Sequence, residues 1–206
     1  MANNERSGNT LIHDTICLFI ITLVSGVLLG AVYMITKQPI ADAEEKAKKE
    51  AYAAVYPDAG FSSDDEINKK LEAFQADLAA GTTKTESGSD LSDVVISEVM
   101  VADKGGYVVT VSGKGYGGAV KMALAIDGDG KVIGIQITDC TNETPGLGQN
   151  SSNEAWNGQY IDKTTADEVK VDKDGGDISA ISGATITSRA VTRAVNGALL
   201  FIASLG

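Results

Sequence analysis

The sequence predicts an α+β protein with one N-terminal transmembrane helix and a domain whose mainly antiparallel sheet is packed by helices. Three observations support this fold class: an uncharged run near the N-terminus, four β-branched runs separated by Gly and Asp, and amphipathic stretches before and after these runs. The chain has 206 residues, enough for one anchor and one domain with a hydrophobic core. We divide it into a tail (1–14), a transmembrane helix (15–36), a helical connector and helix-rich part (37–93) and a domain expected to hold the site (94–206).

Residues 15–36 carry no charge and lie between Asp14 and Lys37. About 20 apolar residues are enough to span a bilayer core. A cleavable signal peptide would have a shorter apolar run followed by a small-x-small site, so we predict a retained membrane helix. Gly26 and Gly30 are four residues apart and would let a neighbouring membrane helix pack closely. The flanking charges do not decide the orientation of the helix.

The charge pattern excludes some partners. The formal net charge is -11, and residues 1–40 contribute nothing to it, because Glu5 and Asp14 cancel Arg6 and Lys37. An acidic domain without a basic stripe is a poor binder of nucleic acid, so no nucleic-acid partner is expected.

The same composition excludes some kinds of site. A single histidine, His13, excludes a Ser-His-Asp triad and a multi-histidine metal site within this chain. Cys17 and Cys140 lie far apart, so we predict neither a disulfide scaffold nor an iron-sulfur centre. We interpret Cys17 as a packing residue in the membrane helix and Cys140 as a small residue in a loop.

Two helical stretches follow the anchor. Residues 41–55 are rich in Ala, Glu and Lys at i,i+4 spacing, which predicts a helix that ends before Pro57. Residues 63–80 begin with Ser-Ser-Asp-Asp and predict a second helix with a core-facing side. That side consists of Ile67, Leu71, Phe74 and Leu78. The polar residues 81–93 indicate a loop.

The periodicity then changes to that of strands. Gly and Asp supply turns between β-branched runs, so the runs predict consecutive hairpins and an antiparallel sheet. The predicted strands are Val94 to Val101, Tyr107 to Ser112, Ala119 to Ile126 and Val132 to Thr138. A long loop at 139–162 contains the only tryptophan and is expected to have a function. A short strand at 168–171 and a helix from Ser188 to Ser204 complete the prediction.

A phosphate seat is predicted at residues 182–188, Ser-Gly-Ala-Thr-Ile-Thr-Ser. Gly183 and Ala184 allow a ligand to approach the backbone, and the free amides at the start of the following helix favour a negative charge. Thr185, Thr187 and Ser188 add hydroxyl donors. Taken alone, these residues also fit an ordinary helix N-cap.

A second motif lies in the long loop. Its six residues are Glu143, Thr144, Pro145, Gly146, Leu147 and Gly148. A rigid proline with two flexible glycines is able to close over a flat ligand, with Leu147 as the apolar contact. A plain surface turn is the alternative.

The two motifs in this order, behind one membrane helix, resemble the FMN-binding domain family. The resemblance is strongest to the G subunits of the Rnf complex, the membrane-bound ferredoxin:NAD oxidoreductase. The C subunit of the sodium-pumping NADH:quinone reductase is a near relative. Residues 115–118, Gly-Tyr-Gly-Gly before a strand, also fit this family. The resemblance covers nearly the whole chain.

The resemblance implies a covalent FMN, joined through its phosphate to the hydroxyl of Thr185 by a flavin transferase that uses FAD and magnesium. The remaining cofactor-binding residues would be Ser182, Gly183, Ala184, Thr187 and Ser188 at the phosphate, with Glu143, Thr144, Pro145, Gly146, Leu147 and Gly148 beside the isoalloxazine. One departure concerns the position three residues before Ser182. The family often has Asp there, whereas this chain has Ser179, with Asp177 two residues earlier.

The resemblance also implies a function. The chain would be an electron-transfer subunit of an Rnf complex in a bacterial or archaeal cytoplasmic membrane, working with other membrane and peripheral subunits and coupled to sodium or proton translocation. Its domain would face the extracytoplasmic side, and no catalytic substrate site of its own is visible. The alternatives are the equivalent quinone-reductase subunit and a membrane-tethered FMN-binding scaffold or sensor.

Overall fold

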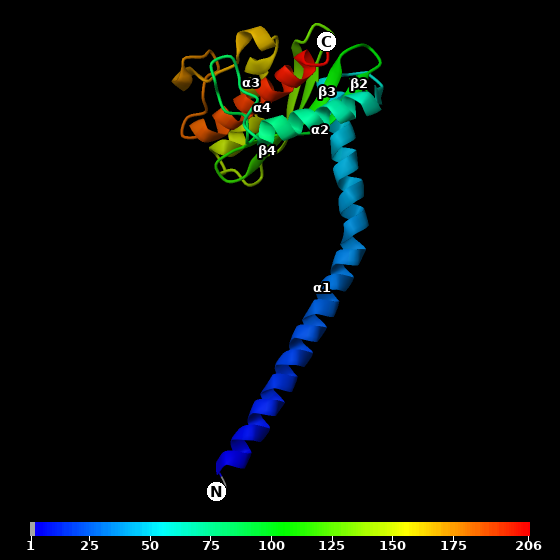
Figure 1. The fold of residues 1–206 in the computed structure, drawn as a ribbon, viewed down its shortest axis with the longest axis vertical. Coiled ribbons are helices and arrows are strands. Elements are labelled where there is room, and N and C mark those ends of the chain that lie inside the picture. Colours follow the sequence, from blue (N-terminus) through cyan, green and yellow to red (C-terminus); the bar gives the residue numbers. More distant parts are fainter. Residues whose placement is uncertain (1–2) are drawn as a thin grey trace. The chain divides into compact units, whose positions relative to one another are not determined.

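The computed structural model describes the backbone from Asn3 to Gly206 and the side chains from Ile12 onward (Figure 1). Within it, the chain divides into two compact units, with the boundary between Ala47 and Lys48. The second unit, Lys48–Gly206, contains the whole sheet and also the predicted helix at 63–80 and the loop at 81–93.

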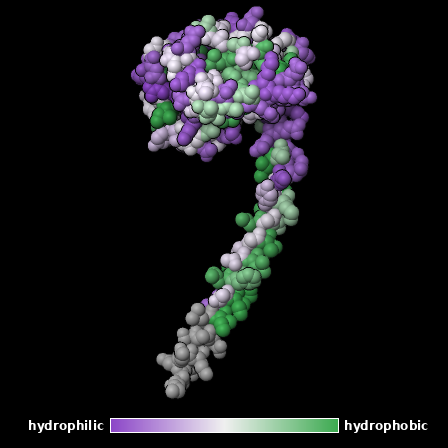
Figure 2. All heavy atoms as spheres, viewed as in Figure 1, coloured by the Kyte–Doolittle hydropathy of each residue, from purple (hydrophilic) through white to green (hydrophobic). Residues whose placement is uncertain are grey.

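The first helix, α1 (Asn3–Val55), runs without a break through the predicted membrane segment and through Pro39. It ends before Pro57, as predicted. The predicted tail is helical from Asn3 onward, and residues 1–2 lie outside the described residues. Between Ile12 and Ile40 the large apolar side chains are exposed, and Figure 2 shows them as a hydrophobic surface along the helix. This helix is long and apolar enough to cross a membrane.

Five antiparallel strands form one sheet with the order β1-β2-β3-β4-β5. They are β1 (Phe61–Ser62), β2 (Val95–Ala102), β3 (Tyr107–Lys114), β4 (Ala119–Ile126) and β5 (Val132–Asp139). Four of them match the predicted hairpins, with ends that differ by at most two residues. The short β1 was not predicted, because two residues carry no readable periodicity. The predicted α+β fold with a mainly antiparallel sheet is confirmed.

Helices cover one face of this sheet. Helix α2 (Asp65–Ala79) packs mainly on β2, and α4 (Thr185–Ala203) packs mainly on β3. On α2, Leu71 and Leu78 are buried, and Ile67 and Phe74 pack at the edge of the same core, which confirms the predicted face. The main core lies between these helices and the sheet.

The last turns of α1 cover part of the opposite face. Ala51, Tyr52 and Val55 form a second apolar cluster with Val108, Ala123 and Ala125. The side chains of β4 are therefore buried on both faces: large ones face α4 and small alanines face α1. This burial on two sides makes β4 the centre of the domain.

The predicted strand at 168–171 is wrong. A 3-10 turn, η3 (Thr165–Asp167), precedes it, and Glu168 has a φ of 39°, which a strand does not tolerate. Instead of pairing with a strand, the buried Val169 has its N–H and C=O hydrogen bonded to the side chain of Asn196, at 3.0 and 2.8 Å. Val171 makes only an isolated bridge with Ile178.

The long loop is built from short helices. These are η1 (Gly148–Ser152), α3 (Glu154–Asn157) and η2 (Gly158–Tyr160), and a further turn, η4 (Asp172–Asp174), follows η3. Tyr160 is fully buried, its hydroxyl lies 2.9 Å from that of Thr192 on α4, and burial raises its pKa. Trp156 stacks edge-on against Tyr160 and donates its indole N–H to the carbonyl of Ser179 at 2.7 Å. The loop is thereby anchored to α4 and to the segment that leads into it.

Gly113 in β3 marks a close approach of the sheet to α4. A Cβ atom at this position would overlap the backbone carbonyl of Ala190. We expect Gly113→Ala to lower the free energy of unfolding by about 1–3 kcal/mol, because the helix has to shift. Denaturant unfolding followed by the fluorescence of Trp156 measures the change. Gly128→Ala is the control, since a Cβ there meets nothing within 4 Å; equal losses for both variants would contradict the prediction.

Candidate functional site

A cavity of about 510 Å³ lies at the N-terminal end of α4. Its volume is in the range typical of small-molecule sites, about 300–1,000 Å³. The lining residues are Tyr116, Glu143, Thr144, Leu147, Gly148, Gly183, Ala184, Thr185, Ile186 and Thr187. The two predicted motifs, which are far apart in the sequence, therefore form one site.

The N-terminus of α4 has no side-chain cap. Ala184 occupies the cap position, and no side chain accepts a hydrogen bond there. Among the described residues, the amides of Thr185, Ile186 and Thr187 have no hydrogen-bond partner. Gly183 has a φ of 76°, a conformation that glycine adopts without strain, and it turns the chain into the helix. Free amides and the helix dipole together favour an anion at this end.

Thr185 is the first residue of α4 and is half-buried in the cavity wall. Its hydroxyl makes no hydrogen bond to any other residue in the described part of the chain. Ser182 is exposed just outside the cavity lining, and its hydroxyl likewise has no partner among residues 12–206. The ordinary N-cap interpretation of this motif is therefore wrong for both side chains.

Thr187 and Ser188 differ from Thr185 because their hydroxyls are already engaged. The hydroxyl of the buried Thr187 donates to the Oε2 atom of Glu143 at 2.5 Å. That of Ser188, also buried, accepts from the amide of Ile181 and donates to the carbonyl of Ala184, both at 3.0 Å. Ser188 lies outside the cavity lining and shapes the turn before the helix, so this geometry does not favour the predicted phosphate contact from its hydroxyl.

The loop of the second motif forms the opposite wall of the cavity. The carbonyl of Thr144 accepts from the amide of Leu147 at 3.1 Å, which closes a tight turn, and Gly146 has a φ of 75° within it. Pro145 and Gly146 are exposed and are not among the residues that line the cavity. The side chain of Leu147 would lie 3.0 Å from a Cβ at Gly183, so the absence of a side chain at Gly183 lets the two walls approach.

Two apolar residues of the cavity were not predicted, Tyr116 and Ile186. They are 72% and 48% exposed, and Leu147 beside them is 40% exposed. Large apolar side chains are seldom left open to water in a cluster without a function. The glycine-rich turn around Tyr116 was a usable signal in the sequence. No sequence signal indicated Ile186, because the direction of its side chain depends on where the helix begins.

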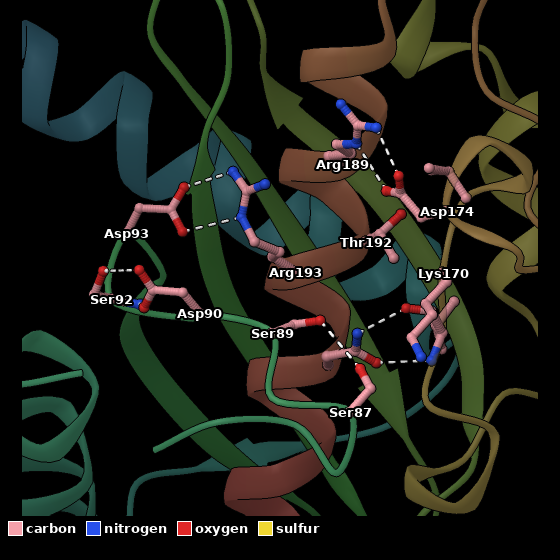
Figure 3. Close-up of a pocket in the computed structure, with 13 residues that line it drawn as sticks. Ser87, Ser89, Asp90, Ser92, Asp93, Lys170, Asp174, Arg189, Thr192 and Arg193 are labelled. Carbon is pink, nitrogen blue, oxygen red and sulfur yellow. Dashed lines mark hydrogen bonds and ion pairs between the residues drawn. The ribbon is translucent and has the colours of Figure 1, made fainter. Parts of the chain in front are cut away.

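A larger cavity, of about 580 Å³, lies along the side of α4 (Figure 3). Four of its six charged side chains form two ion pairs, while Asp90 is hydrogen bonded to Ser92 and Lys170 pairs with Glu168. Arg189 holds Asp174 through two hydrogen bonds of 2.7 and 2.6 Å and lowers the pKa of that carboxyl. Arg193 holds Asp93 at 3.0 and 2.6 Å. Because these groups satisfy each other and neither motif lines this cavity, we assign the site to the smaller cavity.

Known proteins match residues 115–200 of the domain and also nearly the whole chain. The FMN-binding domain family matches residues 115–200. The G subunit of the proton-translocating ferredoxin:NAD(+) oxidoreductase complex of Clostridium ljungdahlii is 33% identical over 198 residues, which cover 95% of this chain and 93% of that protein. The G subunit of the Na(+)-translocating complex of Acetobacterium woodii is 33% identical over 184 residues, covering 87% and 85%.

A solved structure also matches in part. It is the C subunit of the Na(+)-translocating NADH-quinone reductase from Parabacteroides distasonis, with a TM-score of 0.42 and 21% identity, over 66% of this chain and 94% of that one.

Proposed function

Since the chain belongs to the family of G subunits of ion-translocating ferredoxin:NAD(+) oxidoreductase complexes, and thus has an electron-transfer role in such an oxidoreductase, we propose that it carries FMN covalently on Thr185. The observation that supports the proposal most directly is the free hydroxyl of Thr185 beside the uncapped amides of α4.

The residues of the cavity fit the group. The amides of Thr185, Ile186 and Thr187 would hold the phosphate, and the exposed apolar side chains of Tyr116, Leu147 and Ile186 would pack against the flat ring system. Bound FMN supplies one- and two-electron transfer, and the protein binds it, orients it and tunes its potential.

Attachment requires an outside enzyme in this proposal. The Oγ atom of Thr185 attacks the flavin-side phosphorus of FAD, a new O–P bond forms, the pyrophosphate P–O bond breaks, AMP leaves and the hydroxyl proton passes to the transferase. Within the described residues, no base is hydrogen bonded to Thr185, so the activation of this hydroxyl falls to a flavin transferase with magnesium.

We further propose that α1 spans the cytoplasmic membrane and that the domain lies on its extracytoplasmic side. There it would pass electrons between other subunits of the complex, coupled to the translocation of sodium ions or protons. The two relatives are each 33% identical to this chain, and their names specify different ions, protons in one and Na(+) in the other.

The test is to produce the full-length chain with and without a flavin transferase, denature it and measure intact mass and in-gel ultraviolet fluorescence. A fluorescent band that is heavier by one FMN less one water, seen only with the transferase, supports the proposal. A dark band of unmodified mass under both conditions would overturn it and favour a scaffold or sensor domain.

The position three residues before Ser182 is expected to limit the rate of attachment. The backbone of Ser179 is held at its N–H by Gln159 at 2.8 Å and at its carbonyl by Trp156, which leaves its side chain exposed. The nearby Asp177 is paired with Lys163. We expect Ser179→Asp to speed flavin attachment by roughly a factor of ten, equivalent to about 1.4 kcal/mol of barrier, by restoring the carboxylate that is frequent in the family.

The rate is measured as flavin fluorescence against time with purified transferase and FAD. Ser63→Asp, which adds the same charge at an exposed position before α2, is the control. Equal rates for Ser179→Asp and the unchanged chain would show that the transferase does not use this carboxylate.

A further inference from the structure

The side chain of Glu143 joins three segments of the cavity. It is only 2% exposed, although it is a carboxylate. Its Oε1 atom accepts from the amides of Gly117 and Gly118 at 2.8 and 3.3 Å, and its Oε2 atom accepts from the hydroxyl of Thr187 at 2.5 Å. One side chain thereby ties the turn between β3 and β4 and the long loop to the first turn of α4.

Glycines surround this carboxylate. A Cβ atom at Gly115 would lie 2.5 Å from the Oε1 atom of Glu143, and one at Gly148 would overlap its Oε2 atom and lie 2.8 Å from the Thr187 hydroxyl. A Cβ at Gly117 would overlap the carbonyl of Asn142, the residue before Glu143. Gly115 and Gly117 of the turn between β3 and β4, together with Gly148 of the long loop, therefore let the backbone close around the carboxylate.

The charge of this carboxylate has no cationic partner. Among residues 12–206, the part of the chain whose side chains are described, no Lys, Arg or His side chain pairs with Glu143. Its compensation comes from two amides, one hydroxyl and the positive end of α4. An ion compensated only by dipoles in a buried place acts strongly on charges that form nearby, because the local dielectric constant is low.

We propose that Glu143 is a positioning residue that holds the flavin cavity together and whose negative charge lowers the reduction potential of the bound flavin. The inference rests on the proposed function, because it places FMN in this cavity. Reduction adds negative charge to the flavin, and a buried anion in the cavity wall opposes this charge. Glu143 thus holds the segments of the cavity wall together and is not a primary contact for the phosphate.

Two nearly isosteric variants separate the charge from the packing. In Glu143→Gln the charge is lost, while the amide oxygen still accepts from Gly117 and Gly118 and the amide nitrogen is able to donate to Thr187. In Thr187→Val the carboxylate of Glu143 keeps its charge but loses one of its hydrogen-bond donors. Glu72→Gln removes the same charge at an exposed position on α2 and is the control.

The measurement uses the full-length chain in detergent, made with the flavin transferase and equilibrated with a reference dye of known potential. At fixed ambient potential, we expect Glu143→Gln to raise the ratio of reduced to oxidised flavin by about tenfold, which is about 30 mV for a two-electron couple. Thr187→Val is expected to lower the ratio, and Glu72→Gln to leave it unchanged. A role in packing alone would move both cavity variants in the same direction.

Each outcome decides one question. A higher ratio of reduced to oxidised flavin in Glu143→Gln together with a lower ratio in Thr187→Val supports the inference. An unchanged or lower ratio in Glu143→Gln, or a change in the same direction in both variants, overturns it while leaving covalent FMN intact. If Glu143→Gln takes up no flavin, Thr187→Val decides: a lower ratio than in the unchanged chain supports the inference, and an equal or higher ratio overturns it. Absence of flavin from the unchanged chain would instead refute the proposed function.

Discussion

Thr185→Ala is expected to abolish covalent flavin completely while leaving the domain folded. The side chain of Thr185 makes no hydrogen bond within the described chain, and alanine is the best helix former, so the first turn of α4 loses nothing that holds it in place. The acceptor oxygen is removed, and without it no O–P bond to the flavin can form. Intact mass and in-gel fluorescence of the chain produced with a flavin transferase measure the loss, and circular dichroism checks the fold.

Thr187→Ala is the matched control two residues along the same helix. It deletes the hydroxyl that donates to Glu143, so it should cost about 1–3 kcal/mol of stability by leaving a buried carboxylate short of a donor. It should nevertheless keep the flavin. A dark Thr187→Ala band beside a fluorescent Thr185→Ala band would place the acceptor at residue 187 and contradict the assignment.

Asn196→Ala is expected to cause a large loss of stability, about 2–6 kcal/mol in the free energy of unfolding. The side chain of Asn196 donates to the carbonyl of Val169 at 2.8 Å and accepts from its amide at 3.0 Å, in a buried place. Alanine would leave two buried backbone groups unpaired, each of which costs about 1–3 kcal/mol. Denaturant unfolding followed by the fluorescence of Trp156, the only tryptophan, measures the loss.

The control for this substitution is Asn68→Ala, at a partly exposed position on α2, where a change within about 0.5 kcal/mol is expected. If the two variants lost equal stability, the segment around Val169 would be held by its apolar contacts, and the hydrogen bonds of Asn196 would be incidental.

Features that depend on near neighbours in the chain could be predicted from the sequence. The uncharged run at 15–36 lies within α1, and the four hairpin strands appear where Gly and Asp interrupt β-branched residues. The exception at 168–171 has a physical reason: Glu168 adopts a left-handed conformation, and Asn196 satisfies the backbone that a neighbouring strand would otherwise pair.

By itself, then, the sequence determined the membrane-type helix, the antiparallel sheet and a final helix just after the Ser-Gly-Ala-Thr motif, because local periodicity and turn residues specify these features. The structure begins this helix at Thr185, three residues before the predicted start at Ser188. Only the tertiary structure decided which hydroxyls at that helix are free. Thr187 is engaged by Glu143, 44 residues away, and Ser188 by the turn before it. A side chain's partner is chosen by packing between distant segments, and no local pattern in the chain records that choice.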